Sequence, residues 1–218
     1  MPTSRIQLWF IDLLWSSAER TFSHHGYECP RMFRNRARDI WELFLDIYVS
    51  DFELRGRQIF KLAILTISDT GSKGEREDTS GDAISKIMAD AGGFEEVARE
   101  IVADETGLIA GRLTEWCDTG DIDLVVTTGG TGLGPRDVTP EATRQVIDLE
   151  VPGIAEAMRM ETLKITPFAM LSRSVVGVRN GCLIVNLPGS PKGVTETLEV
   201  ALRGISHALE MVKGWRTH

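Results

Sequence analysis

Cysteine is scarce in this 218-residue chain, which contains only Cys29, Cys117 and Cys182. No two of them form a Cys-x-x-Cys pair, so the sequence indicates neither a structural zinc site nor a disulfide framework. Long hydrophobic runs are also missing, because nothing approaches the roughly 20 apolar residues of a membrane-spanning helix. These absences favour a cytoplasmic protein without a membrane partner.

Clusters of basic residues are absent as well, and the formal net charge is −8. Proteins that bind nucleic acid gain affinity by neutralising phosphates with lysine and arginine, so this charge argues against nucleic acid as the main partner. No lysine precedes Lys61, whereas aromatic residues and arginines are concentrated in residues 1–58. The change in composition divides the chain into an N-terminal extension, residues 1–58, and a main domain, residues 59–218.

The extension contains two apolar stretches. Residues 6–15 are apolar, but Asp12 interrupts them and no small-residue cleavage site follows, unlike in a secretory signal peptide. A later stretch predicts a helix with one apolar face, formed by Ala37, Ile40, Trp41, Phe44 and Tyr48. That face must pack on the main domain, a partner or a second copy. We therefore expect a partly helical extension, to which the sequence assigns no role.

The main domain alternates apolar runs with helical patterns. A buried strand is predicted at residues 61–67, and further strands are predicted at residues 97–102 and 123–127. One helix is predicted at residues 83–91 and ends at Gly92-Gly93. A second helix is predicted to have an apolar face made of Leu108, Ile109, Leu113, Trp116 and Cys117. Such alternation implies parallel strands joined by right-handed crossovers.

The end of the chain departs from this pattern. Residues 175–178 and 182–187 flank Asn180-Gly181, a type I′ turn signal, so a hairpin is expected to add an antiparallel strand. A final helix has an apolar stripe from Val194 to Val212. The predicted fold class is α/β, a three-layer α/β/α domain with a mainly parallel, mixed sheet and a C-terminal hairpin. Ligands bind such sheets beyond the carboxyl ends of the strands.

Three polar segments are expected to meet at that edge: Ser68-Asp69, Ala103-Asp104 and a glycine loop. The loop lies in the stretch TTGGTGLGPRDVTPEAT, residues 127–143. It is not a Walker A motif, because Pro135-Arg136 stands where that motif has Lys-Ser/Thr. Nor is it a dinucleotide fingerprint, whose third glycine would fall at Pro135.

The glycine loop has two interpretations. It is either a tight turn whose glycines supply positive φ or a cradle that presents backbone N–H groups to an anion. Four glycines, at positions 129, 130, 132 and 134, exceed what a turn needs, which favours the cradle. Thr139, Pro140 and Glu141 then predict a helix start, with Thr139 as the N-cap.

Asp104 and Asp137 lie beside the predicted anion site. Each alone is typical of an N-cap or of a favourable partner for a helix dipole. Two carboxylates at the mouth of one anion site are different, because they repel phosphate unless a divalent cation lies between. The pair therefore indicates Mg²⁺-assisted phosphoryl or nucleotidyl transfer.

Two further segments have less specific patterns. Asn186 to Gly193 (NLPGSPKG) is either a plain strand-to-helix turn or a stiff segment that approaches a ligand at Pro188, Gly189 and Ser190. Ser172-Arg173-Ser174 places an arginine beside hydroxyls. That arginine either holds phosphate or is simply solvated.

Residues from Ile59 to about Val212 closely resemble the molybdopterin adenylyltransferase domain, found in molybdenum cofactor biosynthesis protein B and in fusion proteins such as gephyrin. The blocks TISDT, DTSG, TTGGTG, GPRDVTPEAT, ETLKITPFAMLSRS and NLPGSPKG occur in the order typical of that family. They cover nearly the whole main domain and leave the N-terminal extension outside. Any one block alone would be a weak signal.

The resemblance implies that Mg-ATP and molybdopterin, a pterin dithiolene with a terminal phosphate, are substrates. The molybdopterin phosphate attacks the α-phosphorus of ATP, which gives adenylylated molybdopterin and pyrophosphate. The essential aspartates of the family match Asp104 and Asp137, the expected Mg²⁺ ligands. Hydroxyls on the pterin side match Thr131 and Thr162. We further expect Ser68, Asp69 and Gly129 to Gly132 to border the substrates, with Ser172, Pro188, Gly189 and Ser190.

Other activities within the resemblance stay open. A non-catalytic molybdopterin-binding or scaffold module would lack the transfer step, and a related domain acts in metal insertion. The presence of both aspartates favours the enzyme. Family members are commonly trimers, and the product is used for molybdate insertion. The resemblance therefore implies a homotrimer and a molybdate-insertion enzyme as a possible partner.

Overall fold

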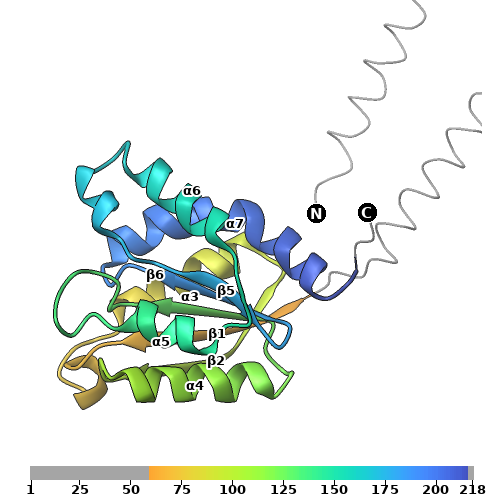
Figure 1. Cartoon of the computed structure of the whole chain (residues 1–218), viewed down its shortest axis with the longest axis horizontal. Helices are drawn as coiled ribbons and strands as arrows, with labels where there is room; N and C mark the ends of the chain where they lie inside the picture. Colours follow the sequence, from red (N-terminus) through yellow and green to blue (C-terminus); the bar gives the residue numbers. More distant parts are fainter. Residues whose placement is uncertain (1–58, 216–218) are drawn as a thin grey trace, which may run out of the picture. The chain divides into compact units, whose positions relative to one another are not determined.

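The computed structural model describes residues 59–215, which fold into one α/β unit (Figure 1). The predicted extension, with its helical face at residues 37–48, lies outside the described residues. The strands are β1 Phe60–Ile67, β2 Phe94–Val102, β3 Leu124–Thr128, β4 Leu149–Glu150, β5 Val176–Arg179 and β6 Cys182–Leu187. The α-helices are α3 Thr79–Ala91, α4 Thr106–Asp118, α5 Thr139–Val146, α6 Pro152–Thr162 and α7 Pro191–Val212. Two 3₁₀ helices are η1 Gly71–Lys73 and η2 Pro167–Leu171.

The strands form a mixed six-stranded sheet in the order β2-β1-β3-β6-β5-β4. Strands β1, β2, β3 and β6 are parallel, and β5 and β4 add antiparallel pairings at one side. Apolar residues on both faces explain this arrangement, since β3 and β6 are buried along their whole length. The predicted mainly parallel, mixed sheet is confirmed.

Helices cover both faces of the sheet, which makes the three layers visible in Figure 1. Helices α3, α6 and α7 pack on one face around Ile64, Met158 and Leu198, and α4 and α5 pack on the other around Ile109 and Val125. Leu108 was expected in the apolar face of α4, and that prediction is wrong because its side chain is 50% exposed. It lies one residue, about 100° around the helix, from the buried Ile109.

The hairpin prediction is confirmed. Asn180 and Gly181 have φ values of 46° and 80°, as a type I′ turn requires, and they join β5 to β6. Helix α3 ends at Gly92, as predicted. Among residues 59–215, no helix is both long and apolar enough to cross a membrane.

The order of the strands defines where a ligand site is expected. From β1 the chain passes to β2 on one side, and β3 lies on the other side of β1. A crevice therefore opens between the loops that follow β1 and β3, at the carboxyl ends of these parallel strands.

Candidate functional site

A hollow lies at this crevice. The loops after β1 and β3 and the start of α3 form most of its wall: Thr66, Ile67, Ser68, Gly71, Arg76, Glu77, Asp78, Thr79, Ser80, Ile101, Asp104, Thr128, Gly129, Gly130 and Gly189. Five residues expected from the sequence to border substrates, Ser68, Asp104, Gly129, Gly130 and Gly189, are among them. The expected convergence of the loops after β1, β2 and β3 is therefore present.

The glycine loop begins where the backbones of β1 and β3 come close together. Gly129 has a φ of 102°, and a Cβ at this position would lie 2.3 Å from the carbonyl oxygen of Ile67. Thr139 then connects the loop to α5. Its Oγ1 donates to the Gly129 carbonyl at 2.9 Å, and its N–H donates to the Gly130 carbonyl at 3.1 Å. Thr139 was predicted as the N-cap of α5. The N-cap is instead Val138, and the Thr139 hydroxyl shapes the loop.

Asp104 is held by the loop that follows β1. Its Oδ2 accepts from the backbone N–H of Asp69 at 2.7 Å, while Asp69 Oδ1 accepts from the N–H of Asp104 at 3.1 Å. Arg136 binds the Asp69 carboxylate, because its Nε and Nη2 donate to the two carboxylate oxygens at 3.0 and 2.7 Å. Asp69 thus connects Asp104 to the segment that carries Asp137.

Asp104 and Asp137 lie against the same glycine loop. A Cβ at Gly130 would lie 3.4 Å from Asp104 Oδ1, and one at Gly132 would lie 2.9 Å from Asp137 Oδ2. Asp137 Oδ2 also accepts from the Gly134 N–H at 2.7 Å. Side chains at these glycines would therefore crowd both carboxylates.

The carboxylates at this edge influence one another. Partial burial raises the pKa of Asp104, and the charges of Asp69 and Asp137 raise it further. The hydrogen bonds from Arg136 lower the pKa of Asp69. Asp104 thus lies in surroundings where its negative charge is disfavoured until a cation approaches.

The donor set suits Mg²⁺ held jointly with a phosphate. Among the described residues, no group of three or more His, Cys, Asp or Glu side chains forms a complete metal site. Mg²⁺ is usually bound by one or two carboxylates, with waters and substrate phosphates as its other ligands. Asp104 and Asp137 provide two hard oxygen donors of that kind beside an anion cradle.

Arg173 has a role that the sequence did not indicate. The sequence left two interpretations open, in which Arg173 either binds phosphate or is exposed to solvent. Instead its Nε donates to the Gly132 carbonyl at 2.6 Å, its Nη2 donates to the Asp137 carbonyl at 2.5 Å, and its Nη1 pairs with Glu141. The guanidinium therefore braces the segment that contains Asp137.

The two hydroxyls expected on the pterin side, Thr131 and Thr162, and the expected substrate residue Ser172 lie outside the hollow described above. Thr131 and Thr162 are buried, and Thr162 Oγ1 donates to the Met158 carbonyl of its own helix at 2.6 Å. Ser172 Oγ lies 3.0 Å from Ser174 Oγ. A backbone hydrogen bond of 3.0 Å from Arg173 to Thr131 joins this segment to the glycine loop.

The turn at residues 188–190 has structural contacts at each position. The Pro188 carbonyl accepts from Thr128 Oγ1 at 2.7 Å, and the Gly189 carbonyl accepts from Ser80 Oγ at 2.8 Å. Ser190 caps α7, where its Oγ accepts from the Gly193 N–H at 3.1 Å. Only Gly189 of the three lines the hollow.

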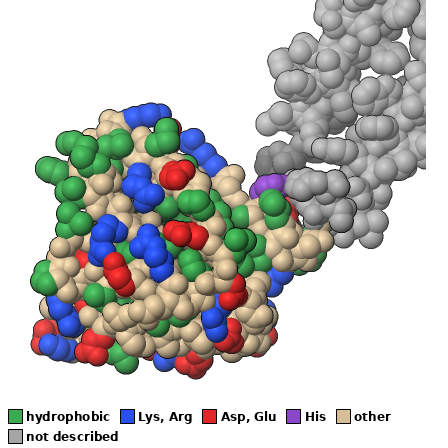
Figure 2. Space-filling model, in the orientation of Figure 1, with side chains coloured by type: hydrophobic (Ala, Val, Ile, Leu, Met, Phe, Trp, Pro, Cys, Tyr) green, Lys and Arg blue, Asp and Glu red, His purple; other side chains and the backbone are tan. Residues whose placement is uncertain are grey.

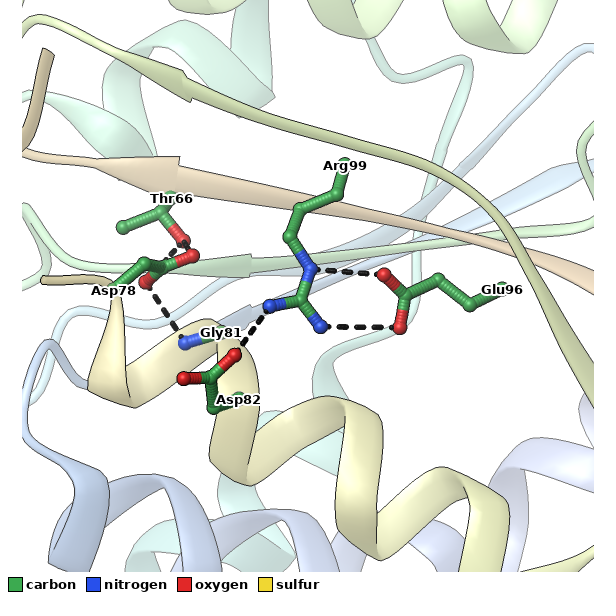
Figure 3. A network of polar contacts seen from close by, with 6 residues as sticks. All are labelled: Thr66, Asp78, Gly81, Asp82, Glu96 and Arg99. Atoms are coloured by element: carbon green, nitrogen blue, oxygen red, sulfur yellow. Dashed lines mark hydrogen bonds and ion pairs between the residues drawn. The ribbon is translucent and has the colours of Figure 1, made fainter.

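The sequence predicts that the polar loop of residues 68–79 borders the nucleotide, but it singles out none of residues 76–80, which form part of the wall of the hollow. Asp78 caps α3 and accepts from Gly81 N–H and Thr66 Oγ1, each at 2.9 Å (Figure 3). The pattern Asp-Thr-Ser-Gly before an apolar helix is typical of an N-cap and marked the position. Arg76 brings a positive charge to the hollow, which the sequence, lacking a basic cluster, did not indicate.

Fold and site together define a class: an α/β domain with a hollow at the switch point of its sheet and two carboxylates beside a glycine loop. Residues 63–207 match the family model described as "Probable molybdopterin binding domain". The chain therefore belongs to this family of molybdenum cofactor biosynthesis proteins.

Individual relatives agree with this assignment. A molybdopterin adenylyltransferase of Helicobacter pylori strain J99 is 46% identical over 158 residues, which cover 72% of this chain and 90% of the relative. The molybdopterin biosynthesis enzyme MoaB of Thermus thermophilus has a similar structure, with a TM-score of 0.68, 53% identity and coverage of 72% and 98% of the two chains. The tungsten cofactor synthesizing protein MoaB of Pyrococcus furiosus has a TM-score of 0.65 and 33% identity, and the match covers 71% and 98%.

Proposed function

We propose that this protein transfers the adenylyl group of ATP to the terminal phosphate of molybdopterin. A molybdopterin phosphate oxygen forms a bond to the α-phosphorus of ATP, and the bond from that phosphorus to the bridging oxygen breaks. Pyrophosphate leaves with the electron pair. The observation that carries the proposal is that Asp104 and Asp137 lie against one glycine loop: Asp104 at Gly130, where both residues line the hollow, and Asp137 at Gly132 and Gly134. The activity named for the Helicobacter pylori relative agrees with it.

Different residues bind the nucleotide and the pterin. Ser68 and the loop at Gly129 and Gly130 line the nucleotide side of the hollow, and Arg76 contributes positive charge beside the triphosphate. The Gly129 N–H donates to the Leu187 carbonyl at 3.2 Å, so this glycine contributes close approach of the backbone and not a donor. Thr131, Thr162 and Ser172 belong to the pterin side. Because phosphoryl transfer depends mainly on positioning and charge stabilisation, these contacts account for most of the catalysis.

Asp104 and Asp137 are the residues that would hold Mg²⁺ at this site. When bound, the ion supplies the positive charge that offsets the charge of the triphosphate in the transition state. Asp69 fixes the backbone beside Asp104, and Arg136 keeps Asp69 in place. The glycines leave room for both carboxylates and for the phosphates.

Replacing Asp137 with asparagine tests the proposal. Asp137→Asn keeps an acceptor for the Gly134 N–H but removes the charge, so adenylylation should be lost while molybdopterin still binds. Asp90→Asn, at an exposed position on α3, is the control and should retain full turnover. Turnover of Asp137→Asn at the wild-type rate in Mg-ATP would refute the assignment. Absence of pyrophosphate release by the wild type would leave a binding or scaffold module, or a metal-insertion domain, instead.

A homotrimer is part of this proposal. Exposed apolar side chains gather on α6, η2 and the end of the glycine loop: Leu133, Met160, Leu163, Ile165, Phe168, Met170 and Leu171. Figure 2 shows hydrophobic side chains at the end of the molecule where Figure 1 places α6. Exposed patches of this kind mark interfaces. Light scattering should give three times the chain mass, and Phe168→Ser with Met170→Ser should lower it.

The cellular setting follows from the same reaction. Adenylylated molybdopterin is an activated intermediate, so we propose that a molybdate-insertion enzyme consumes it. ATP as a substrate favours a cytoplasmic location. Pull-down with this chain preloaded with product tests the partner.

A further inference from the structure

Arg173 joins two segments that are far apart in sequence. It lies between η2 and β5, yet all of its acceptors belong to residues 131–141. Its backbone N–H donates to the Thr131 carbonyl at 3.0 Å. Its guanidinium donates to the carbonyls of Gly132 and Asp137 at 2.6 and 2.5 Å and pairs with Glu141.

These contacts occupy the guanidinium within the protein. Nε, Nη1 and Nη2 each have a protein acceptor, and Glu141 balances the charge. The side chain is 31% exposed. A lysine has a single ammonium group and cannot reach three separated acceptors in one plane, whereas the fork of an arginine can. The geometry therefore points to a bracing role and not to phosphate binding.

The braced segment is the one that carries Asp137. Residues 134–137 form a turn that is closed twice, because the Asp137 N–H donates to the Gly134 carbonyl at 3.0 Å and the Gly134 N–H donates to Asp137 Oδ2 at 2.7 Å. Arg173 binds the carbonyl before this turn, at Gly132, and the carbonyl at its end, at Asp137. Residues 132–137, which include the turn, are thereby held at both ends.

We propose that Arg173 is a positioning residue for adenylyl transfer: it holds the Gly132–Asp137 turn so that the Asp137 carboxylate stays at the glycine loop. This inference rests on the function proposed above. It also couples the two sides of the site, because the backbone N–H of Arg173 donates to the carbonyl of Thr131, which is expected on the pterin side. Displacement of a catalytic group by about 1 Å lowers turnover by about 100-fold.

Arg179 offers a matched control. Its guanidinium also spans two elements, since Nε and Nη2 donate to Asp118 at 3.0 and 2.7 Å and Nη1 donates to the Val146 carbonyl at 2.8 Å. None of these partners lines the hollow. Loss of either arginine removes a similar set of hydrogen bonds, but only Arg173 contacts the Asp137 turn.

The test compares Arg173→Gln, Arg173→Lys and Arg179→Gln in the full chain. We expect kcat of Arg173→Gln to fall about 10- to 100-fold, with KM for ATP within about threefold, because the turn acts on the transition state. Amide hydrogen exchange of residues 130–138 should become faster. Arg173→Lys should not restore kcat, since the fork is lost. Arg179→Gln should change neither kcat nor exchange in that segment.

Two results would overturn the inference: kcat of Arg173→Gln within threefold of wild type, or equal losses in Arg179→Gln. If Arg173→Gln does not fold, Glu141→Gln removes one partner of the guanidinium and should cause the same changes to a smaller degree. Unchanged exchange and turnover in that variant would count against the proposal. If the wild type itself releases no pyrophosphate, the proposed function fails, whereas the exchange data still decide whether Arg173 fixes the turn.

Discussion

Asp69 and Asp104 exchange hydrogen bonds: each backbone N–H donates to the carboxylate of the other residue, at 2.7 and 3.1 Å. The exchange ties the loop after β1 to the loop after β2 at the ligand edge of the sheet. It also brings two negative charges together, and Arg136 compensates only that of Asp69 directly. The arrangement suits a site whose cation arrives with the substrate.

Asp104→Asn should separate stability from activity. The folded protein raises the pKa of Asp104 above its usual 3.8, mainly through burial. The folded state therefore binds this proton more tightly than the unfolded state, and stability falls as pH rises from 3.8 through the folded pKa. Asparagine removes this loss, so the variant should melt at a higher temperature at pH 7. Its kcat should fall at least about 100-fold.

Melting curves at pH 7 and pH 3 check this prediction. The stabilisation should vanish at pH 3, where the wild-type carboxyl is protonated in both states. Asp90→Asn, on the exposed side of α3, should change neither quantity. A lower melting temperature for Asp104→Asn at pH 7 would contradict the pKa direction.

Arg136→Gln should weaken binding of the nucleotide. The variant removes the cation that pairs with Asp69 and offsets the charge of Asp104, so the repulsion between these carboxylates and the triphosphate grows. Both partners of the Asp69–Arg136 pair are exposed to solvent, so water and salt screen the charge of Arg136. We therefore expect KM for Mg-ATP to rise only about 3- to 5-fold.

Ionic strength gives that prediction a second readout. Salt screens exposed charges, so the difference from wild type should shrink between low salt and about 0.5 M salt. Arg136→Lys keeps the charge and should have a KM near that of wild type. A salt-independent difference would point to lost structure and not to lost charge.

Gly129→Ala should destabilise the fold strongly. Its φ of 102° is unfavourable for alanine, and the new Cβ would lie 2.3 Å from the backbone oxygen of Ile67. Neither backbone can move without disturbing β1 or β3, so we expect a loss of about 3 kcal/mol or more, measured by urea unfolding. Gly111→Ala is the matched control because it lies within α4, with no atom within 4 Å of its Cβ. It should stabilise the protein by about 0.5–1 kcal/mol.

Local patterns predicted most of the fold because they depend on neighbours in sequence. Asn180-Gly181 predicted its turn from backbone preference alone, and the apolar runs at residues 61–67 and 123–127 predicted β1 and β3. The predicted N-cap of α5, Thr139, is wrong by one position. Its hydroxyl donates to the Gly129 carbonyl instead, a contact that exists only in the folded loop. Such contacts between distant segments leave no periodic signal.

In the site, too, local sequence patterns were predictable and contacts between distant segments were not. The resemblance matched Asp104 and Asp137, and the strand order explains why they approach one loop. Arg173 is different, because its partners at residues 131–141 are more than thirty positions away and three of them are backbone carbonyls, which carry no sequence signal. Only the tertiary structure shows that it braces the loop.

Asp78→Ala should impair both the fold and the nucleotide hollow. The Asp78 carboxylate caps α3 at Gly81 and accepts from the buried Thr66 hydroxyl on β1 (Figure 3). Removing it loses an N-cap worth about 1 kcal/mol and leaves the Thr66 hydroxyl without this acceptor, at a further cost of about 1 kcal/mol. Because Asp78 and the following Thr79 and Ser80 line the hollow, KM for ATP should rise as well.

Asp78→Asn and Asp82→Asn make this last prediction specific. Asparagine at position 78 still caps a helix and accepts from Thr66, so the free energy of unfolding should fall by less than about 1 kcal/mol. Asp82 lies one turn further along α3 and pairs with Arg99, which also binds Glu96 on β2 (Figure 3). That pair is outside the hollow, so Asp82→Asn should leave KM for ATP unchanged. If Asp82→Asn raised KM as much as Asp78→Ala, the effect would come from loosening α3 as a whole and not from the wall of the hollow.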